Sequence, residues 1–401
     1  MDLLVYLFII VSVMLAFFLV LPTINVLASL FRREKLNVPG KLRNHDFGCV
    51  ITAYKNVDIA KGLVRSLLMQ AHQNHHIYLV ADACDVSDWD LTNEKLTLLR
   101  PTEPLNLKVK SIIHAVENFV RHHDYIAVFD ADNLAHPDFL GEINRYANAG
   151  HLAIQGQRTA KNLDTIMACA DALGEFYKNY IDREAPYRNG SSAVISGSGM
   201  AVETALYKAY LTSPEIEQGK HQWKKMLQED KILQNFLLRQ DIKISYARKA
   251  ICYDEKVTSA SAVETQRSRW LFSYFQNIPN SLGILRRGLV NFSWNQWLFG
   301  LVTIAPPMFI MLFAATGLAL IGLFIHVWVS LLLAVAIVLF VLTIFWTLHL
   351  SRAPKAVWAA VGAMPAFILR QLRGLLKMGN PNKNFKHTEH SRSVTIEEVL
   401  K

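Results

Sequence analysis

The chain has 401 residues, of which 52% are hydrophobic and 19% are charged. Soluble globular proteins have about 25% charged residues, and disordered chains are poor in apolar residues, so this composition excludes disorder and favours a membrane protein. The formal net charge is +9. Because long apolar segments accompany this charge, we assign it to membrane lipids and a phosphorylated substrate, with no nucleic acid as a partner.

The first apolar segment predicts an N-terminal transmembrane anchor over residues 1–31. No Asp, Glu, Lys or Arg occurs from Leu3 to Phe31, and a helix needs roughly 20 apolar residues to cross a bilayer. A secretory signal peptide would have a basic region before the apolar run and a small-residue cleavage site after it. The segment has neither feature, so we interpret it as a retained anchor.

A second uncharged stretch predicts a two-span hairpin over residues 297–350. Its spans are expected at about Leu298–Phe324 and Val327–His349. Residues 352–380 are expected to form an interfacial amphipathic helix, because their apolar run is short and contains Pro365.

Basic residues predict the orientation in the membrane. Arg32 and Arg33 follow the first span, and Arg352 and Lys355 follow the last. Since basic flanks stay on the cytoplasmic side, we expect the N-terminus outside and both the middle domain and the tail, residues 381–401, in the cytoplasm.

The middle of the chain, residues 45–258, predicts an α/β fold with a mostly parallel sheet. Apolar runs at Phe47–Ala53, Ile77–Ala81 and Tyr125–Phe129 are separated by helical patterns. Such runs are typical of strands that helices cover on both faces. Ligands bind these sheets beyond the carboxyl ends of the strands, so we expect the site there.

Acidic residues follow two of these strands. Asp82 follows the second, and Asp130 and Asp132 form an Asp-x-Asp sequence after the third. Two adjacent carboxylates repel each other unless a cation lies between them, and Mg²⁺ or Mn²⁺ held by oxygen typically bridges to substrate phosphates. A lone Asp-x-Asp is often a solvated turn, but its position directly after an apolar strand predicts a metal site.

Glu229 and Asp230 form a second acidic pair at a helical pattern. Asp230, Leu233 and Leu237 share one face by their spacing, so Asp230 falls in the apolar stripe. Placing a carboxylate on an apolar helix face costs free energy, so we expect Asp230 to have a function there. General-base catalysis is one such function. An ion pair with a neighbouring lysine is the alternative.

The segment 261–292 is expected to form interfacial helices that carry a Gln-Arg-Ser-Arg-Trp sequence. Gln266, Arg269 and Trp270 lie on one face of such a helix. Arginine suits a pyrophosphate, and tryptophan offers a flat surface to a sugar ring. Taken alone, Trp270 is more typical of a membrane-interface anchor.

In this order, the motifs resemble those of the membrane-integrated family 2 glycosyltransferases, which include cellulose, hyaluronan and poly-N-acetylglucosamine synthases and ceramide glucosyltransferase. The resemblance implies a GT-A catalytic domain, a UDP-sugar donor, Mg²⁺ or Mn²⁺, and inversion at the anomeric carbon. It further implies that Asp132 is the metal ligand and that Asp230, with Glu229 beside it, is catalytic. Substrate binding is implied for Ala53, Tyr54, Asp82, Lys110, Asp130, Ser198, Gly199, Gln266, Arg269 and Trp270.

Some positions depart from the family pattern. Lys55-Asn56 replaces a common Asn-Glu, and His114 stands where an asparagine is frequent. In the tail, Phe385 and His390 replace the Trp and Arg of polysaccharide-type members. The donor sugar is therefore not assigned by the resemblance.

The resemblance predicts sugar transfer to a growing exopolysaccharide, with single transfer to a lipid as the alternative. Phe272, Tyr274 and Phe275 could line a path for a sugar chain. Three spans are few for a polymer channel, which favours a lipid. A membrane nucleotidyltransferase and a nucleotide-binding pseudoenzyme are the other classes that the sequence leaves open, and it assigns no oligomeric state.

Overall fold

The computed structural model describes residues 3–32, 36–222, 228–258, 260–369 and 394–400. The strands are β1 (Phe47–Asn56), β2 (His75–Asp85), β3 (Leu96–Leu99), β4 (Tyr125–Asp130), β5 (Leu134–Ala135), β6 (Ala153–Ala160), β7 (Met200–Glu203) and β8 (Ile244–Asp254). The helices of the sheet domain are η1 (Asp58–Ala60), α2 (Lys61–Leu68), α3 (Lys108–Glu117), α4 (Phe139–Asn148), α7 (Thr204–Leu211), α8 (Pro214–Gln222), α9 (Glu229–Arg239) and α16 (Ile396–Val399).

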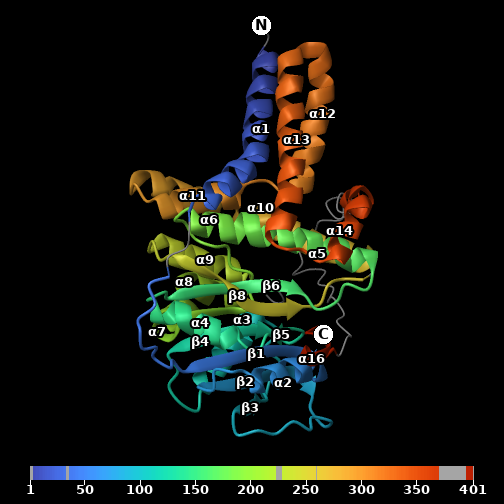
Figure 1. Ribbon diagram of the computed structural model, residues 1–401. Coiled ribbons are helices and arrows are strands. Elements are labelled where there is room, and N and C mark those ends of the chain that lie inside the picture. The colour runs from blue at the N-terminus through green and yellow to red at the C-terminus, as the bar shows by residue number, and fades with distance from the viewer. Residues whose placement is uncertain (1–2, 33–35, 223–227, 259, 370–393, 401) are drawn as a thin grey trace.

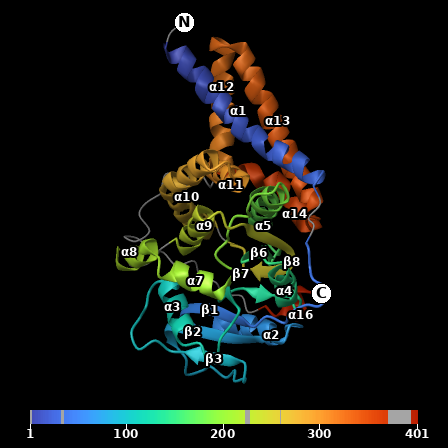
Figure 2. The ribbon, with the colours of Figure 1, turned by 90° about the vertical axis from the view of Figure 1, so that its left-hand side faces the viewer.

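The remaining helices form an apolar bundle at one end of the molecule or lie between that bundle and the sheet (Figure 1). They are α1 (Leu3–Leu30), α5 (Ile166–Lys178), the π-helix η2 (Asn179–Glu184), α6 (Ala185–Arg188), α10 (Ala260–Val290), α11 (Trp294–Ile304), α12 (Met308–Ile325), α13 (Val327–Leu350), α14 (Lys355–Ala359) and η3 (Ala360–Ala363). Figure 1 shows α1, α12 and α13 side by side at one end, a belt formed by α5, α10, α11 and α14 beneath them, and the sheet below. The view turned by 90° in Figure 2 has the same three layers.

The described strands form one eight-stranded sheet in the order β3-β2-β1-β4-β7-β6-β8-β5. β1 pairs in parallel with β2 and β4, and β6 pairs in parallel with β8. β7 runs antiparallel to both β4 and β6. This mostly parallel sheet with helices around it confirms the predicted α/β fold.

The strand register brings the polar residues to one edge. Thr52 pairs with Asp130 across β1 and β4, and Tyr54 pairs with Asp82 across β1 and β2. The apolar residues before them are buried, so helices can cover both faces of the central strands. The carboxyl ends of β1, β2 and β4 therefore meet beneath the belt of helices.

Within the described residues, three helices are long and apolar enough to cross a membrane: α1, α12 and α13. The first span of the hairpin begins at Met308 and not near Leu298. Pro306 and Pro307 explain the difference, because proline lacks the N–H of a helix interior and disfavours helical geometry in the residue before it. The apolar residues that precede them form the separate helix α11.

Helices α10 and α11 pack as a close antiparallel pair beside the membrane helices. A Cβ on Gly288 would lie 2.3 Å from the backbone nitrogen of Trp297, and one on Gly300 would lie 2.6 Å from that of Leu285. Only glycine permits this approach. The belt is also joined to the membrane bundle, since the ring of Tyr177 in α5 lies 5.9 Å from that of Phe340 in α13.

The predicted interfacial helix at 352–380 is described as far as residue 369. The apolar helical stretch is Lys355–Leu369. Residues 370–380, most of the predicted tail, and its Phe385–His390 segment lie outside the described residues.

Candidate active site

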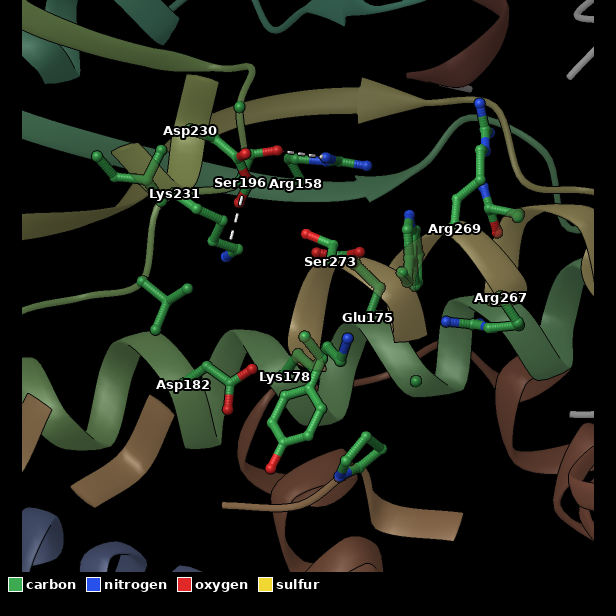
Figure 3. A pocket seen from close by; sticks show the side chains of 18 of the residues that line it. Arg158, Glu175, Lys178, Asp182, Ser196, Asp230, Lys231, Arg267, Arg269 and Ser273 are labelled. Carbon is green, nitrogen blue, oxygen red and sulfur yellow. Dashed lines mark hydrogen bonds and ion pairs between the residues drawn. The ribbon is translucent and has the colours of Figure 1, made fainter. Parts of the chain in front are cut away.

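A cavity of about 810 Å³ lies between the carboxyl edge of the sheet and the membrane helices. Its lining comes from the ends of β1 and β4, the first turns of α3 and α9, one face of α5 and η2, and parts of α1, α10 and α12. Figure 3 shows residues from α5, α9 and α10 around this space. The structure brings these predicted residues together in the lining: Tyr54, Asp130, Asp132, Glu229, Asp230, Gln266, Arg269 and Trp270.

Lys108, at the start of α3, joins the two acidic motifs. Its Nζ donates to Asp130 Oδ1 at 2.6 Å and to the carbonyl oxygen of Gly197 at 2.7 Å, and lies 3.5 Å from Glu229 Oε1. Burial alone would raise the pKa of the Asp130 carboxyl, but the nearby Lys108 and Arg158 cations outweigh it and hold that pKa below its ordinary value. Asp130 is therefore ionised and held in place before any ligand binds.

The loop before β7 approaches the start of α9 at Gly197. This glycine has a φ of +84°, and a Cβ there would lie 3.5 Å from the Cβ of Asp230. A side chain would be strained in this conformation. Asp230 thus lies in the first turn of α9 beside a loop backbone that Lys108 fixes.

Glu229, the residue before Asp230, is a carboxyl close to the Lys108 ammonium. Burial raises the pKa of Glu229 to about 7, against the opposing charge of Lys108. Above pH 7 the ionised carboxylate attracts Lys108, which also holds Asp130 and Gly197. Protonation below pH 7 removes that attraction.

We expect the transfer rate to fall as the pH is lowered from 8 to 6, with an apparent pKa of about 7. Glu229→Gln lacks the charge at every pH and should have a lower, flat rate over this range. Initial rates at saturating donor would measure both profiles. An unchanged profile in Glu229→Gln would assign the titration to another group.

Asp130 and Asp132 fit a divalent cation that is bound together with a diphosphate. Lys161 Nζ donates to the carbonyl oxygen of Asp132 at 3.0 Å and fixes the turn that carries it. Among the described residues, no cluster of three metal-binding side chains occurs. Mg²⁺ is commonly held by one or two carboxylates plus substrate phosphates, so two carboxylates at the cavity edge suffice.

The Gln-Arg-Ser-Arg-Trp sequence lies in α10 and faces the cavity. Burial lowers the pKa of Arg269, so its charged form would gain from an anionic ligand. Trp270 is 39% exposed, and the guanidinium of Arg267 lies 4.3 Å from its ring centroid. Arg267 also pairs with Asp171 of α5, so it fixes α10 against that helix.

A buried network of charges fastens α5 and η2 to the sheet. Glu175 lies 3.1 Å from Arg183 and 3.6 Å from Lys256, and Lys256 lies 2.8 Å from Asp254. Arg158 pairs with Asp254 and donates to the carbonyl oxygen of Ser196 at 3.0 Å. Removing one partner from such a network leaves a buried charge unpaired, which is strongly destabilising.

Five predicted binding residues do not line the cavity: Ala53, Asp82, Lys110, Ser198 and Gly199. Asp82 is 2% exposed and accepts hydrogen bonds from the backbone nitrogens of Leu105 and Asn106 at 2.7 and 2.8 Å. Asn106 in turn accepts from the Tyr54 hydroxyl at 3.0 Å. Asp82 therefore positions the loop that supports Tyr54.

The other differences have local causes. Lys108 occupies the cavity in place of Lys110, because two residues along a helix turn a side chain by about 200°. Ala53 points away between Thr52 and Tyr54, as strand alternation requires. In the loop before β7, Ser196 and Gly197 reach the cavity, while Ser198 is buried behind them and a Cβ on Gly199 would lie 2.8 Å from the Cβ of Cys252.

Several cavity residues have no motif by which the sequence could reveal them. They are Lys108, Arg158, Glu175, Lys178 and Asp182. Arg267 lies within a motif that the sequence singled out. The other residues are brought to the cavity by contacts between segments that are distant in the sequence.

Comparisons with known proteins agree with this geometry. The family model for "Glycosyltransferase like family 2" matches residues 45–273, more than half of the chain. The chain therefore belongs to this glycosyltransferase family, and it is an enzyme of that class. A search of the curated proteins returns no match.

Of two solved structures that match the chain, the first shares its fold. The mannosyltransferase PcManGT from Pyrobaculum calidifontis, in complex with GDP-Man and Mn²⁺, is 12% identical with a TM-score of 0.56, over 93% of this chain and 100% of that chain. TarS residues 1–349 from S. aureus are 12% identical with a TM-score of 0.39, over 60% of this chain and 65% of that chain. The first likeness identifies the fold as GT-A-like.

Proposed function

We propose that the protein is an inverting membrane glycosyltransferase that moves a sugar from a nucleotide sugar to a hydroxyl group of a lipid. The observation that carries this proposal is the composition of the cavity wall. Asp130, Asp132 and Asp230 line one end of the cavity, and residues of α1 and α12 line the other. An amphiphile lying between the membrane helices could thus present its polar head to the acidic end.

The apolar end favours a lipid over a growing polysaccharide. Phe18, Pro22 and Phe309 come from membrane-spanning helices and contribute to the same lining as the carboxylates. A sugar chain needs a polar path lined with aromatic rings. Of the aromatic residues that could form such a path, Phe272 and Phe275 do not line the cavity. Tyr274 does line it, and its hydroxyl donates to the carbonyl oxygen of Ile304 at 2.9 Å.

The chemistry follows from the positions of the side chains. Asp230 accepts the proton of the acceptor hydroxyl while the hydroxyl oxygen bonds to the anomeric carbon. The bond from that carbon to the diphosphate oxygen breaks, and its electron pair leaves with the nucleoside diphosphate. A divalent cation held by Asp132 and Asp130 would neutralise charge on the diphosphate. Attack opposite the leaving group inverts the anomeric centre.

The donor and the orientation are further parts of the proposal. A UDP-sugar fits the motif resemblance, and the complex of PcManGT with GDP-Man and Mn²⁺ makes a GDP-sugar the second candidate. Basic flanks support a catalytic domain in the cytoplasm, at the plasma membrane. Labelling of His326→Cys by an impermeant thiol reagent in intact cells, with Val120→Cys unlabelled, would test this orientation.

We expect purified full-length protein to release UDP or GDP from its sugar donor faster when a hydroxyl-bearing lipid is present. The assay uses a panel of UDP- and GDP-sugars with Mn²⁺, with and without diacylglycerol in phosphatidylcholine nanodiscs. The product should be lipid with one added sugar, identified by mass spectrometry. A water-soluble polymer formed without lipid would contradict the lipid acceptor and support an exopolysaccharide.

A further inference from the structure

The membrane-side wall of the cavity carries two charged side chains that the reaction does not use. Lys178 ends α5, and Asp182 lies four residues later in the π-helix η2. Both line the cavity, and Figure 3 shows them on the helix that lies across the space from Asp230 and Lys231. π-Helices are rare and occur frequently at functional sites.

Neither side chain has a hydrogen bond or ion pair within the described part of the chain. The Lys178 ammonium has only a cation–π contact, 5.0 Å from the ring centroid of Trp270. By contrast, their neighbours Glu175 and Arg183 on the same helix are paired with each other at 3.1 Å. The protein thus satisfies the charges that fasten this helix and leaves Lys178 and Asp182 facing the cavity.

The surroundings favour a ligand that forms hydrogen bonds with both groups. Burial lowers the pKa of Lys178 to about 8 and raises the pKa of Asp182, the latter against the opposing charges of Lys178, Arg183 and Lys231. The Lys178 side chain is nevertheless exposed in the cavity wall and that of Asp182 is partly exposed, so a hydrogen-bonding headgroup can reach both groups. Space is available beside them, because a Cβ on Gly174, one turn before Lys178, would meet nothing within 4 Å.

The opposite signs of the two groups restrict the chemistry of that headgroup. A phosphate drawn to Lys178 would also approach the Asp182 carboxylate, in a cavity whose lining contains more acidic than basic residues. A hydroxyl group can donate to Asp182 and accept from Lys178 at no electrostatic cost. An uncharged headgroup with several hydroxyls therefore fits this wall better than an anionic one.

We infer that Lys178 and Asp182 form the headgroup subsite of the acceptor and select a lipid with an uncharged, hydroxyl-bearing headgroup. This inference rests on the proposed lipid acceptor. Lys178 and Asp182 are then specificity-determining residues. They hold the acceptor while Asp230, across the cavity, receives the proton.

The test compares Lys178→Met and Asp182→Asn with the wild type in nanodiscs of phosphatidylcholine. The acceptor probes are diacylglycerol, an alkyl glucoside and a polyprenyl phosphate. We expect wild-type transfer to the two uncharged probes, and a rise of about tenfold or more in their KM in each variant, the size expected for losing a hydrogen bond to a charged group. The KM for the nucleotide sugar and its hydrolysis without acceptor should stay unchanged.

Matched controls are Lys208→Met and Asp88→Asn, two exposed positions that do not line the cavity. They should retain the wild-type acceptor KM, and donor binding shows that each variant is folded. Transfer to lipid with an unchanged acceptor KM in both cavity variants, or a wild-type preference for the polyprenyl phosphate, would overturn the subsite alone. Transfer only to soluble sugars would overturn the lipid acceptor itself, and the subsite with it.

Discussion

Replacing Asp230 with asparagine is expected to lower the rate of sugar transfer by a factor of about 10² to 10⁴ while nucleotide binding stays near normal. Asp230 lies in the first turn of α9 and lines the cavity beside Gly197. The amide keeps the shape of the side chain but cannot accept the acceptor proton. Single-turnover rates and calorimetric titration with UDP or GDP measure the two quantities separately.

Asp138→Asn is a suitable control for this experiment. Asp138 is a surface carboxylate whose side chain is 66% exposed, and it does not line the cavity. It should retain wild-type turnover. Retention of more than a tenth of wild-type turnover in Asp230→Asn would remove Asp230 from the role of general base.

Replacing Asp132 with alanine is expected to abolish the enhancement of nucleotide binding by Mn²⁺. The variant would retain Asp130 as the carboxylate of the motif, and Asp130 is already paired with Lys108 at 2.6 Å. This paired carboxylate alone would have to hold the cation. Calorimetry with UDP or GDP, with and without Mn²⁺, gives the affinity ratio. Asp138→Ala should show the wild-type ratio, and the same ratio in Asp132→Ala would show that Asp132 is not a ligand.

The features that the sequence could predict are those that depend on local pattern. The apolar runs before Asp82 and Asp130 predict strands of a parallel sheet, and these strands, β2 and β4, pair in parallel with β1 on either side of it. The face shared by Gln266, Arg269 and Trp270 follows from helical periodicity, and all three line the cavity.

Features that depend on helix phase or on distant contacts could not be predicted in this way. Whether Lys108 or Lys110 faces the cavity depends on the rotation of α3 about its axis. No local sequence pattern determines that rotation. Lys178 and Asp182 reach the cavity because the network around Glu175 holds α5 against the sheet. The start of α12 depends on whether Pro306 and Pro307 interrupt a continuous apolar run. A hydropathy pattern alone does not reveal that interruption.

The participation of α1 in the cavity wall would make bilayer thickness a variable of the proposed reaction. Phe18, Leu21, Pro22 and Asn25 line the cavity and belong to a helix that is long and apolar enough to cross a membrane. Helices whose apolar length does not match the surrounding hydrocarbon adjust by tilting. Tilting of α1 would move this wall relative to Asp230, which is attached to the sheet domain. With the proposed lipid acceptor, acyl-chain length in the host membrane would therefore set part of the distance between the acceptor and Asp230.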